Sequence, residues 1–276
     1  MAAPPLGWTD GTVTVAGRSV FYRRSPDAGP GPPIVHVHGF GISGSYLMPT
    51  ARLLAPHAVN VVPDLPGYGR SARQSSVLGI PALAAALVAV LDALGLDRVV
   101  LVGNSMGCPV SLEVAHAAPD RVHRLVLVSP AGGVQNQPLP RALAQLGRDA
   151  LRESPRMAAV AVPDYLHFGP FNALRLFRQL TQFPSLERLL QTPVPSLAVL
   201  GSRDPLMPPP RRVQEVGRRA PRHVTVVLIE GAAHAVNFSH PGELAHVIGA
   251  WLDDREIVDD PTQPGLARVV QIRRTP

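Results

Sequence analysis

The sequence predicts an α/β fold in which helices cover both faces of a mostly parallel sheet. In the first half of the chain, short apolar, β-branched runs alternate with segments that have helical spacing of apolar residues. This is the pattern of a parallel sheet buried on both faces. Over about residues 132–193 only the helical pattern remains, and the alternation resumes after it. Such an all-helical insertion is suited to form a lid over the carboxyl edge of the sheet.

Each element follows from these patterns and from the turn-forming residues between them. An opening hairpin is expected from residues 12–15 and 19–23. Further strands are expected at residues 34–38, 59–63, 97–102, 124–129, 196–200 and 223–229. Helices are expected at residues 46–55, 80–94, 108–115, 139–151, 155–162, 172–190, 210–219 and 241–253, with proline breaks at Pro163, Pro170 and Pro184.

The same patterns divide the chain into a core and a cap. We expect residues 1–131 and 194–254 to form the two parts of one α/β core, with residues 132–193 as a helical cap. Residues 255–276 are polar and contain several prolines, which predicts a C-terminal tail. Within that tail, residues 268–272 could pair as one more strand.

Composition excludes several kinds of chemistry. All 26 basic residues are arginines, and the absence of lysine excludes a Ser-Lys dyad, a Schiff-base lysine and covalent pyridoxal phosphate. The glycine-rich loop at residues 39–44 has neither dinucleotide-binding spacing nor a P-loop lysine. We therefore expect no cofactor and no metal site.

Charge and hydropathy exclude other classes of protein. The net charge of +6 is spread along the chain in arginine pairs, and aromatic residues make up only 5%, so no nucleic-acid partner is expected. No apolar run approaches the roughly 20 residues that cross a bilayer, and the N-terminus does not resemble a signal peptide. The single cysteine, Cys108, allows no intrachain disulfide. We expect a cytoplasmic protein whose partner is a small-molecule substrate, and leave its oligomeric state open.

Residues 103–107 read Gly-Asn-Ser-Met-Gly and lie between an expected strand and an expected helix. This context is that of a nucleophile elbow. The two glycines let the backbone bend tightly without a Cβ clash, which exposes the hydroxyl of Ser105. We predict that Ser105 is a nucleophile; a plain glycine-rich turn is the alternative. Cys108, three residues later, is interpreted as a small packed side chain, with a reactive thiol at a helix start as the alternative.

Without lysine, Ser105 needs a histidine as its base, and that histidine needs a carboxylate to orient it. His234 follows the last expected core strand by a short turn, at the edge of the sheet where Ser105 is expected. His240, six residues later, is its rival. Asp204 follows the strand at residues 196–200, and the order Ser105, Asp204, His234 is that of this type of hydrolase triad.

A second acid position is available at the end of the strand at residues 124–129. It holds Ser129-Pro130 and no carboxylate, which favours Asp204 as the acid. A turn-forming role is the alternative for Asp204, because Asp-Pro favours turns. For the developing oxyanion we expect two backbone donors, the N–H of Met106 and the N–H of Phe40, with that of Gly41 as second choice.

Five motifs in this order resemble the α/β-hydrolase superfamily over roughly residues 13–252. They are Val-His-Gly-Phe at 37–40, Asp-Leu-Pro-Gly-Tyr-Gly-Arg-Ser at 64–71, the elbow at 103–107, Gly-Ser-Arg-Asp at 201–204 and Gly-Ala-Ala-His at 231–234. The resemblance implies a twisted, mostly parallel eight-stranded sheet with a helical cap. It also implies that Asp64 and Gly67 belong to a structural turn.

Within that superfamily, the elbow is similar to those of carboxylesterases and of meta-cleavage-product (C–C bond) hydrolases. Two residues differ from the C–C hydrolases, which usually carry Trp after the histidine and a second Gly after the elbow; here these positions hold Ala235 and Cys108. A cap arginine, Arg156, Arg175 or Arg178, could bind a substrate carboxylate, but an exposed helix arginine is the simpler interpretation.

The favoured function is therefore a serine hydrolase that cleaves carboxylic esters through an acyl-enzyme on Ser105. We expect small, largely apolar acyl or aromatic substrates, because Leu, Phe and Met side chains of the cap should line the pocket. The enzymatic alternatives are a C–C bond hydrolase for meta-cleavage products or β-diketones and a biosynthetic thioesterase or lactonase. A non-catalytic binding scaffold is the alternative from another class, and it would usually lack a triad member.

Overall fold

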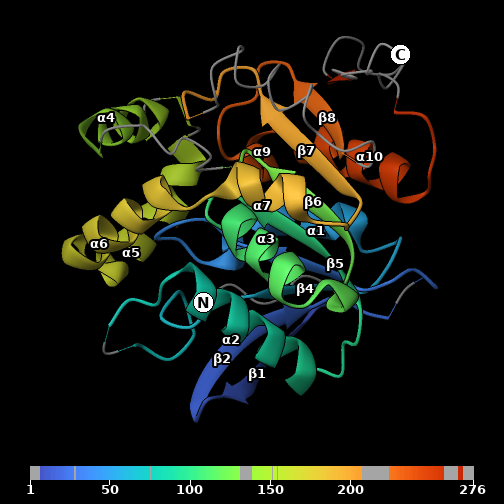
Figure 1. The fold of residues 1–276 in the computed structure, drawn as a ribbon, viewed down its shortest axis with the longest axis horizontal. Helices are drawn as coiled ribbons and strands as arrows, with labels where there is room; N and C mark the ends of the chain where they lie inside the picture. Colours follow the sequence, from blue (N-terminus) through green and yellow to red (C-terminus); the bar gives the residue numbers. More distant parts are fainter. Residues whose placement is uncertain are drawn as a thin grey trace.

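A nine-stranded sheet forms the centre of the computed structural model (Figure 1). The structure describes residues 7–27, 29–74, 76–130, 139–150, 152–153, 155–206, 224–257 and 267–269. The strand order is β1-β2-β4-β3-β5-β6-β7-β8-β9. The strands are β1 Thr9–Val15, β2 Arg18–Arg24, β3 Ile34–Val37, β4 Asn60–Pro63, β5 Val99–Asn104, β6 Val122–Val128, β7 Ser196–Gly201, β8 Val224–Ile229 and β9 Ala267–Val269.

The strands from β4 to β8 in this order are parallel, whereas both ends of the sheet are antiparallel. The hairpin β1–β2 is joined to β4 by antiparallel pairing, and β9 runs antiparallel to β8. The predicted α/β-hydrolase fold with its mostly parallel sheet is therefore confirmed. The short β9 lies at residues 267–269, slightly before the strand considered for residues 268–272, and it is the ninth strand beyond the eight implied by resemblance.

Helices cover both faces of this sheet. The described helices are α1 Met48–Leu54, α2 Ile80–Ala93, α3 Gly107–Ala117, α4 Leu139–Ala150, α5 Pro155–Phe168, α6 Pro170–Gln182, α7 Ser185–Gln191, α9 Val236–Ser239 and α10 Pro241–Leu252, with short 3-10 turns at Gly44–Leu47 and Pro119–Arg121. The expected helix at residues 210–219 lies outside the described residues. None of the described helices is long and apolar enough to cross a membrane.

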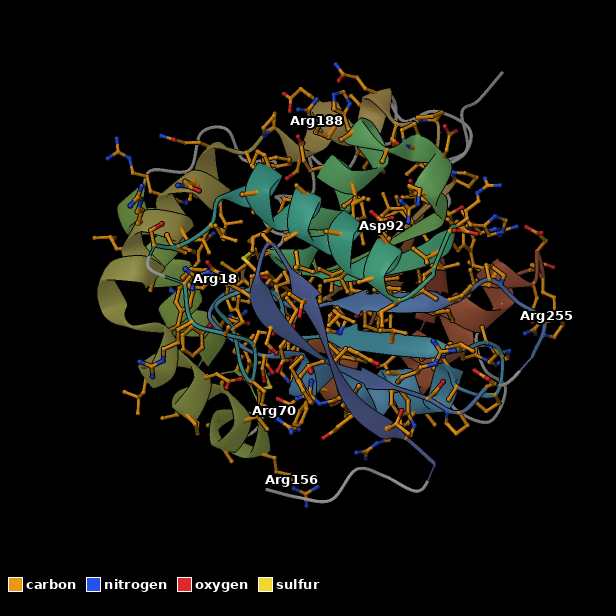
Figure 2. The ribbon with its side chains drawn as sticks, turned by 90° about the horizontal axis from the view of Figure 1, so that it is seen from below. Arg18, Arg70, Asp92, Arg156, Arg188 and Arg255 are labelled. Atoms are coloured by element: carbon orange, nitrogen blue, oxygen red, sulfur yellow. The ribbon has the colours of Figure 1, made fainter. Side chains whose placement is uncertain are left out.

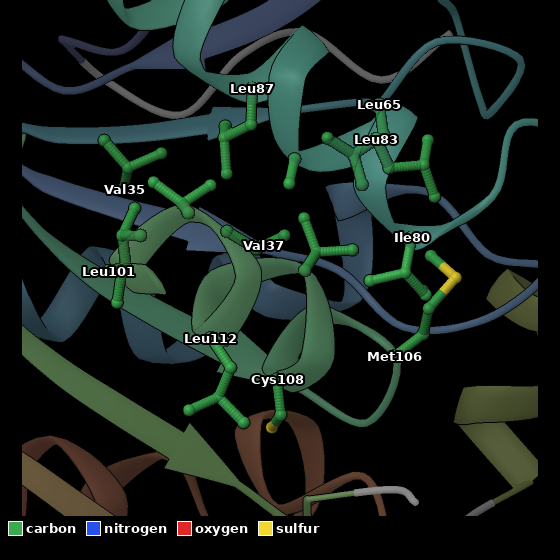
Figure 3. Packing of buried hydrophobic residues seen from close by; sticks show 14 of the residues in the cluster. Val35, Val37, Leu65, Ile80, Leu83, Leu87, Leu101, Met106, Cys108 and Leu112 are labelled. Carbon is green, nitrogen blue, oxygen red and sulfur yellow. The ribbon is translucent and has the colours of Figure 1, made fainter. Parts of the chain in front are cut away.

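Side chains that alternate along the strands build two separate cores. Val35, Val37 and Leu101 face α2 and α3, where they pack against Leu83 and Leu87 (Figure 3). The next residues along the same strands, Ile34, Val100 and Val102, point to the opposite face. There they join a cluster with Leu54 of α1 and with Leu244 and Ile248 of α10. Each fully buried aliphatic side chain of this kind contributes about 1.5–3 kcal/mol. Burial on both faces holds the parallel strands in register, so their carboxyl ends form one rigid edge.

Helices α4 to α7 are inserted between β6 and β7, and α4, α5 and α6 lie together to one side of the sheet (Figure 1). This segment packs on the core, because Phe168, Leu176, Leu180 and Leu189 join the same hydrophobic cluster as α2 and α3. Its division from the core at residues 132–193 stays a prediction.

Two of the expected proline breaks differ in outcome. The break predicted at Pro163 is wrong, because α5 continues through it to Phe168. The break at Pro184 is present, since the single helix expected at residues 172–190 is divided there into α6 and α7. A proline inside a helix removes one hydrogen bond, and in α5 the packed cap supplies enough contacts to continue the helix.

Candidate active site

Ser105 stands between β5 and α3 in a strained backbone conformation. Its φ of +53° lies in the left-handed region, which costs a non-glycine residue on the order of 1–3 kcal/mol. The surrounding turn holds it there, because Ser105 N donates to the carbonyl of Val128 at 3.0 Å and Cys108 N donates to the carbonyl of Ser105 at 3.0 Å. Strain of this kind, fixed between two buried elements, is a common feature of functional sites.

The two glycines of the elbow act through close packing. Neither has a positive φ, so the sharp bend expected of them falls on Ser105 itself. A Cβ on Gly103 would collide with the backbone of Gly107, and a Cβ on Gly107 would collide with the carbonyl of Val37. The glycines therefore allow α3 to approach β3 and β5 closely enough to hold the turn.

Asp204 and His234 meet at the carboxyl edge of the sheet, each in the loop after a strand. Oδ2 of Asp204 lies 2.8 Å from Nδ1 of His234, and both residues are buried. Asp204 also accepts the N–H of Leu206 at 2.8 Å. This is the geometry in which a carboxylate fixes the orientation and tautomer of an imidazole.

Burial and charge act in opposite directions on this pair. Burial would raise the pKa of Asp204, but the charge and hydrogen bond of His234 keep that pKa below its ordinary value. Burial would likewise lower the pKa of His234, but the carboxylates around it, chiefly Asp204, raise it to about 9. The pair is therefore most stable as carboxylate and imidazolium.

The other ring nitrogen of His234, Nε2, is buried and has no hydrogen-bond partner among the described residues. The structure thus brings Asp204 and His234 together, and it places Ser105 at the same edge without a hydrogen bond to the imidazole. Such bonds are often absent before substrate binds. Once the ring is neutral, Nε2 can accept a proton.

Asn104, the residue before Ser105, connects the loops of the site. Its Oδ1 accepts a hydrogen bond from the Tyr46 hydroxyl at 2.6 Å, and that hydroxyl accepts the N–H of Gly39 at 2.8 Å. Its Nδ2 donates to the carbonyls of Val128 and His234 at 3.1 and 3.4 Å. The network therefore joins the loop after β3 to the elbow and to the loop that carries His234. Sequence reasoning missed both Asn104 and Tyr46; an Asn directly before the serine was the available signal.

The loop after β3, which contains Phe40 and Gly41, lies against the elbow. A Cβ on Gly39 would lie 3.3 Å from the Cβ of Ser105. Met106 is fully buried and immediately precedes the first residue of α3. Both expected oxyanion donors, the N–H groups of Phe40 and Met106, thus belong to segments that meet at Ser105; their role stays a prediction.

The sequence profile of the Alpha/beta hydrolase family matches residues 34–247, most of the chain. The chain belongs to the α/β-hydrolase family. The match extends from β3 to α10 and includes Ser105, Asp204 and His234.

Curated relatives of this α/β hydrolase have different activities. The chain is 41% identical over 111 residues to a 2-hydroxy-6-oxo-2,4-heptadienoate hydrolase of Pseudomonas putida, a match that covers 38% of this chain and 40% of that protein. It is 29% identical over 247 residues to a pimeloyl-[acyl-carrier protein] methyl ester esterase of Aeromonas salmonicida, covering 80% of this chain and 95% of that one. The first similarity is thus confined to well under half of either protein, whereas the second extends over most of both.

A solved structure supports the fold. A bacterial membrane phospholipase A has a TM-score of 0.77 with 23% identity, over 90% of this chain and 86% of that one. At this level of identity the similarity concerns the fold alone. The relatives together support a hydrolase, but their activities differ in the bond that is cleaved. Which bond this chain cleaves must therefore be argued from the chemistry of its site.

Aromatic side chains of core and cap meet beside this hydrolase elbow. The ring of Phe40 lies 5.8 Å from Phe168 and 5.6 Å from Phe177, and Tyr68 stacks on Phe168 at 4.9 Å. Tyr165 lies 6.2 Å from Phe40. The loop of Phe40 is therefore lined by cap residues with an apolar surface.

His36, the rival base His240 and the Cys108 thiol have structural positions. His36 is buried and pairs with Asn60 at 2.6 Å, and burial lowers its pKa to about 4. His240, the rival base, lies 2.9 Å from the Ser239 hydroxyl at the start of α10. The Cys108 thiol is buried, and burial raises its pKa well above the ordinary value, which disfavours the reactive thiolate.

The cap arginines considered for substrate binding are exposed. Arg156 on α5 and both Arg175 and Arg178 on α6 have exposed side chains, and Figure 2 shows Arg156 at the periphery of the molecule. Within the described part of the chain, no group of three or more His, Cys, Asp or Glu residues is arranged to hold a metal ion.

Proposed function

We propose that this α/β hydrolase cleaves carboxylic esters through an acyl-enzyme formed on Ser105. Ser105 is the nucleophile, His234 the general base and Asp204 the residue that orients the imidazole. The observation that carries the proposal is the buried Asp204–His234 pair, 2.8 Å apart, with Nε2 of His234 unpartnered among the described residues. Together with the strained turn at Ser105, this arrangement supports nucleophilic attack by a serine.

The reaction follows from these positions. Ser105 Oγ attacks the ester carbonyl while Nε2 of His234 takes its proton, and the tetrahedral oxyanion is stabilised by the N–H groups of Phe40 and Met106. The imidazolium then gives its proton to the leaving alcohol. A water molecule, deprotonated by the same imidazole, attacks the acyl-enzyme; the bond to Ser105 Oγ breaks, the imidazolium returns its proton to Oγ, and the acid is released. Asp204 stays ionised throughout and stabilises the imidazolium.

The substrate we propose has an apolar acyl or aromatic group. The aromatic cluster of Phe40, Tyr68, Phe168 and Phe177 next to the elbow supports this, because such side chains favour apolar groups over charged ones. The long alignment with a methyl ester esterase adds support for an ester bond.

A C–C bond hydrolase is the second candidate. The 41% identity over 111 residues to a 2-hydroxy-6-oxo-2,4-heptadienoate hydrolase favours it. Ala235, which follows His234 where such hydrolases usually carry tryptophan, argues against it. The two candidates share Ser105 and His234 and differ in the substrate they turn over.

The test is a substrate panel assayed with the wild type and with Ser105→Ala. The panel contains p-nitrophenyl esters of increasing acyl length, an acyl thioester, an acyl-homoserine lactone and a ring-cleavage dienone. We expect turnover of the p-nitrophenyl esters, lowered about 10⁴-fold or more by Ser105→Ala. Turnover of the dienone without the esters would support the second candidate, and turnover confined to the thioester or lactone would redirect the proposal to those bonds. Ester turnover unchanged in Ser105→Ala would overturn it.

A further inference from the structure

Two carboxylates of the cap lie against the loop that carries His234. Asp149, in the last turn of α4, is buried with a relative exposure of 6%. Glu153 follows in the adjoining turn, and its Oε1 accepts the N–H of Ala235 at 2.7 Å. The N–H groups of Arg152 and Glu153 both donate to the carbonyl of Asp149, at 2.8 and 3.0 Å. This closed turn directs both side chains toward the histidine loop.

The two carboxylates share the surroundings of His234. The backbone N–H of His234 faces both of them and lowers the pKa of each, although burial raises both values overall. One oxygen of each, Oδ1 of Asp149 and Oε2 of Glu153, is buried and has no hydrogen-bond partner among the described residues. The backbone of the histidine loop thus satisfies part of the hydrogen-bonding capacity of the pair.

No arginine neutralises this pair within the part of the chain that the structure describes. The guanidinium of Arg152, the nearest in sequence, donates instead to the carbonyl of Arg203 at 2.8 Å. The charge of Glu153 also acts on the hydroxyls of Tyr46 and Tyr165, and burial raises the pKa of both tyrosines, so they are neutral. The groups whose charges act on His234 are therefore Asp204 from the loop after β7 and Asp149 and Glu153 from the cap.

We propose that Asp149 and Glu153 are positioning residues for His234, which hold its loop in place and set the pH at which its imidazole can act as a base. The proposal rests on the proposed function, since it concerns the same histidine. It adds that the cap, which supplies none of the reacting groups, controls one of them. A cap that moves away would release both the loop and the added negative charge.

The direction of the effect follows from the charges. The carboxylates favour imidazolium, so they raise the pKa of His234, which is about 9 instead of 6.5. The pKa of Asp149 is raised to about 6, so Asp149 is ionised over the range in which His234 titrates. Removing either charge must lower the pKa of His234, and ester hydrolysis must then persist to lower pH.

The experiment compares pH profiles of kcat/KM in Asp149→Asn, Glu153→Gln and the double variant. Both amides keep an oxygen that can accept the loop N–H groups while the charge is removed. We expect the acidic limb to move down by about 1 pH unit in each single variant and further in the double. The rate on the alkaline plateau should stay within about twofold. Glu153→Ala, which also loses the acceptor, should lower the plateau kcat about tenfold.

Asp164→Asn is the matched control. Asp164 is also a cap carboxylate that accepts a core backbone N–H, that of Ser43 at 2.7 Å, but it does not act on His234. The acidic limb of the pH profile of Asp164→Asn should coincide with that of the wild type, even if kcat of this variant changes. A limb that moves equally in Asp164→Asn would assign the effect to loss of cap docking and overturn the proposal.

A second readout separates this proposal from the proposed function. The imidazole of His234 can be titrated by NMR in Ser105→Ala, with and without Asp149→Asn and Glu153→Gln, because this measurement needs no turnover. We expect an alkaline pKa that falls in the charge-removal variants. If the His234 pKa is unchanged in the folded double variant, the positioning role is overturned even if Ser105 is the nucleophile. If the His234 pKa is lowered, the positioning role is supported even if esters are not the substrate.

Discussion

Asp64 in the core and the pair Asp149 and Glu153 in the cap all hold carboxylate oxygens away from water, but they are compensated differently. Asp64 is fully buried; its carboxylate lies 2.8 Å from the guanidinium of Arg23 and accepts the N–H groups of Gly44 and Arg70 at 2.8 and 2.9 Å. The cap pair has the N–H groups of His234 and Ala235 and, among the described residues, no arginine.

This difference separates a structural carboxylate from a responsive one. A buried charge is expensive unless a counter-charge and hydrogen bonds compensate it. At Asp64 the compensation comes from within the core, from Arg23 on β2 and from the N–H groups of Gly44 and Arg70, so its charge is locked into the fold. At Asp149 and Glu153 the compensation comes from the histidine loop, so the charge of the cap and the state of His234 depend on each other. The predictions below are ordered by the size of the expected effect.

The largest effect is expected from removing the counter-charge of Asp64. Arg23→Met leaves a buried carboxylate without its cation, which should lower the free energy of unfolding by about 3–5 kcal/mol. Urea denaturation measures it, with Arg24→Ala as control. Arg24 pairs with the exposed Asp27 at 2.9 Å, and such pairs contribute about 0–1 kcal/mol. If both variants lose the same free energy of unfolding, the Arg23–Asp64 pair contributes no more to stability than the exposed Arg24–Asp27 pair.

A smaller effect is expected from the network around Asn104. Tyr46→Phe leaves the N–H of Gly39 and Oδ1 of Asn104 without their shared partner, which should cost about 1–3 kcal/mol of stability and lower kcat. Tyr68→Phe is the control, because the hydroxyl of Tyr68 bonds only weakly, to the sulfur of Met106 at 3.5 Å. If Tyr46→Phe behaves like Tyr68→Phe in both assays, the network does not support the site.

Removing the charge of the cap carboxylate Asp149 should increase stability. Because the pKa of Asp149 is raised from 3.8 to about 6, the folded state binds its proton more tightly than the unfolded state. Ionisation therefore removes stability as pH rises from about 4 to 6, and the penalty is complete above that range. The free energy of unfolding of Asp149→Asn, relative to that of the wild type, should therefore increase by an amount on the order of 1 kcal/mol when the pH is raised from 4 to 8. Thermal unfolding at both pH values measures this, and a loss relative to the wild type at pH 8 would contradict it.

The smallest effect is expected at Cys108. Its thiol is buried and donates to the carbonyls of Gly103 and Val128 at 3.2 and 3.3 Å. A thiol reagent such as dithionitrobenzoate should therefore modify the native protein far more slowly than the urea-unfolded chain. Rapid modification of the native protein with loss of activity would restore the reactive-thiol interpretation.

The sequence predicts those parts of the site that depend on local structure. Ser105, Asp204 and His234 each follow a recognisable strand, so the parallel sheet alone brings them to one edge. The cap contacts of Asp149 and Glu153 could not be predicted, because they depend on how a helical insertion docks on a loop 82 residues away from Glu153. The bond between Tyr46 and Asn104 was equally unpredictable, because it joins two core residues that are 58 positions apart in the sequence. Pro163 was misjudged because tertiary packing outweighs the local propensity of one proline.

The central claim, that Ser105 is a nucleophile activated by His234, is tested most directly by locating a covalent adduct. The wild type, Ser105→Ala and His234→Ala are treated with a fluorophosphonate, and the tryptic peptide from Val99 to Arg121, which contains Ser105, is analysed by mass spectrometry. We predict one adduct per chain on Ser105 in the wild type, none in Ser105→Ala, and labelling slowed at least about 100-fold in His234→Ala. An adduct on another residue, or an unlabelled wild type, would contradict the account.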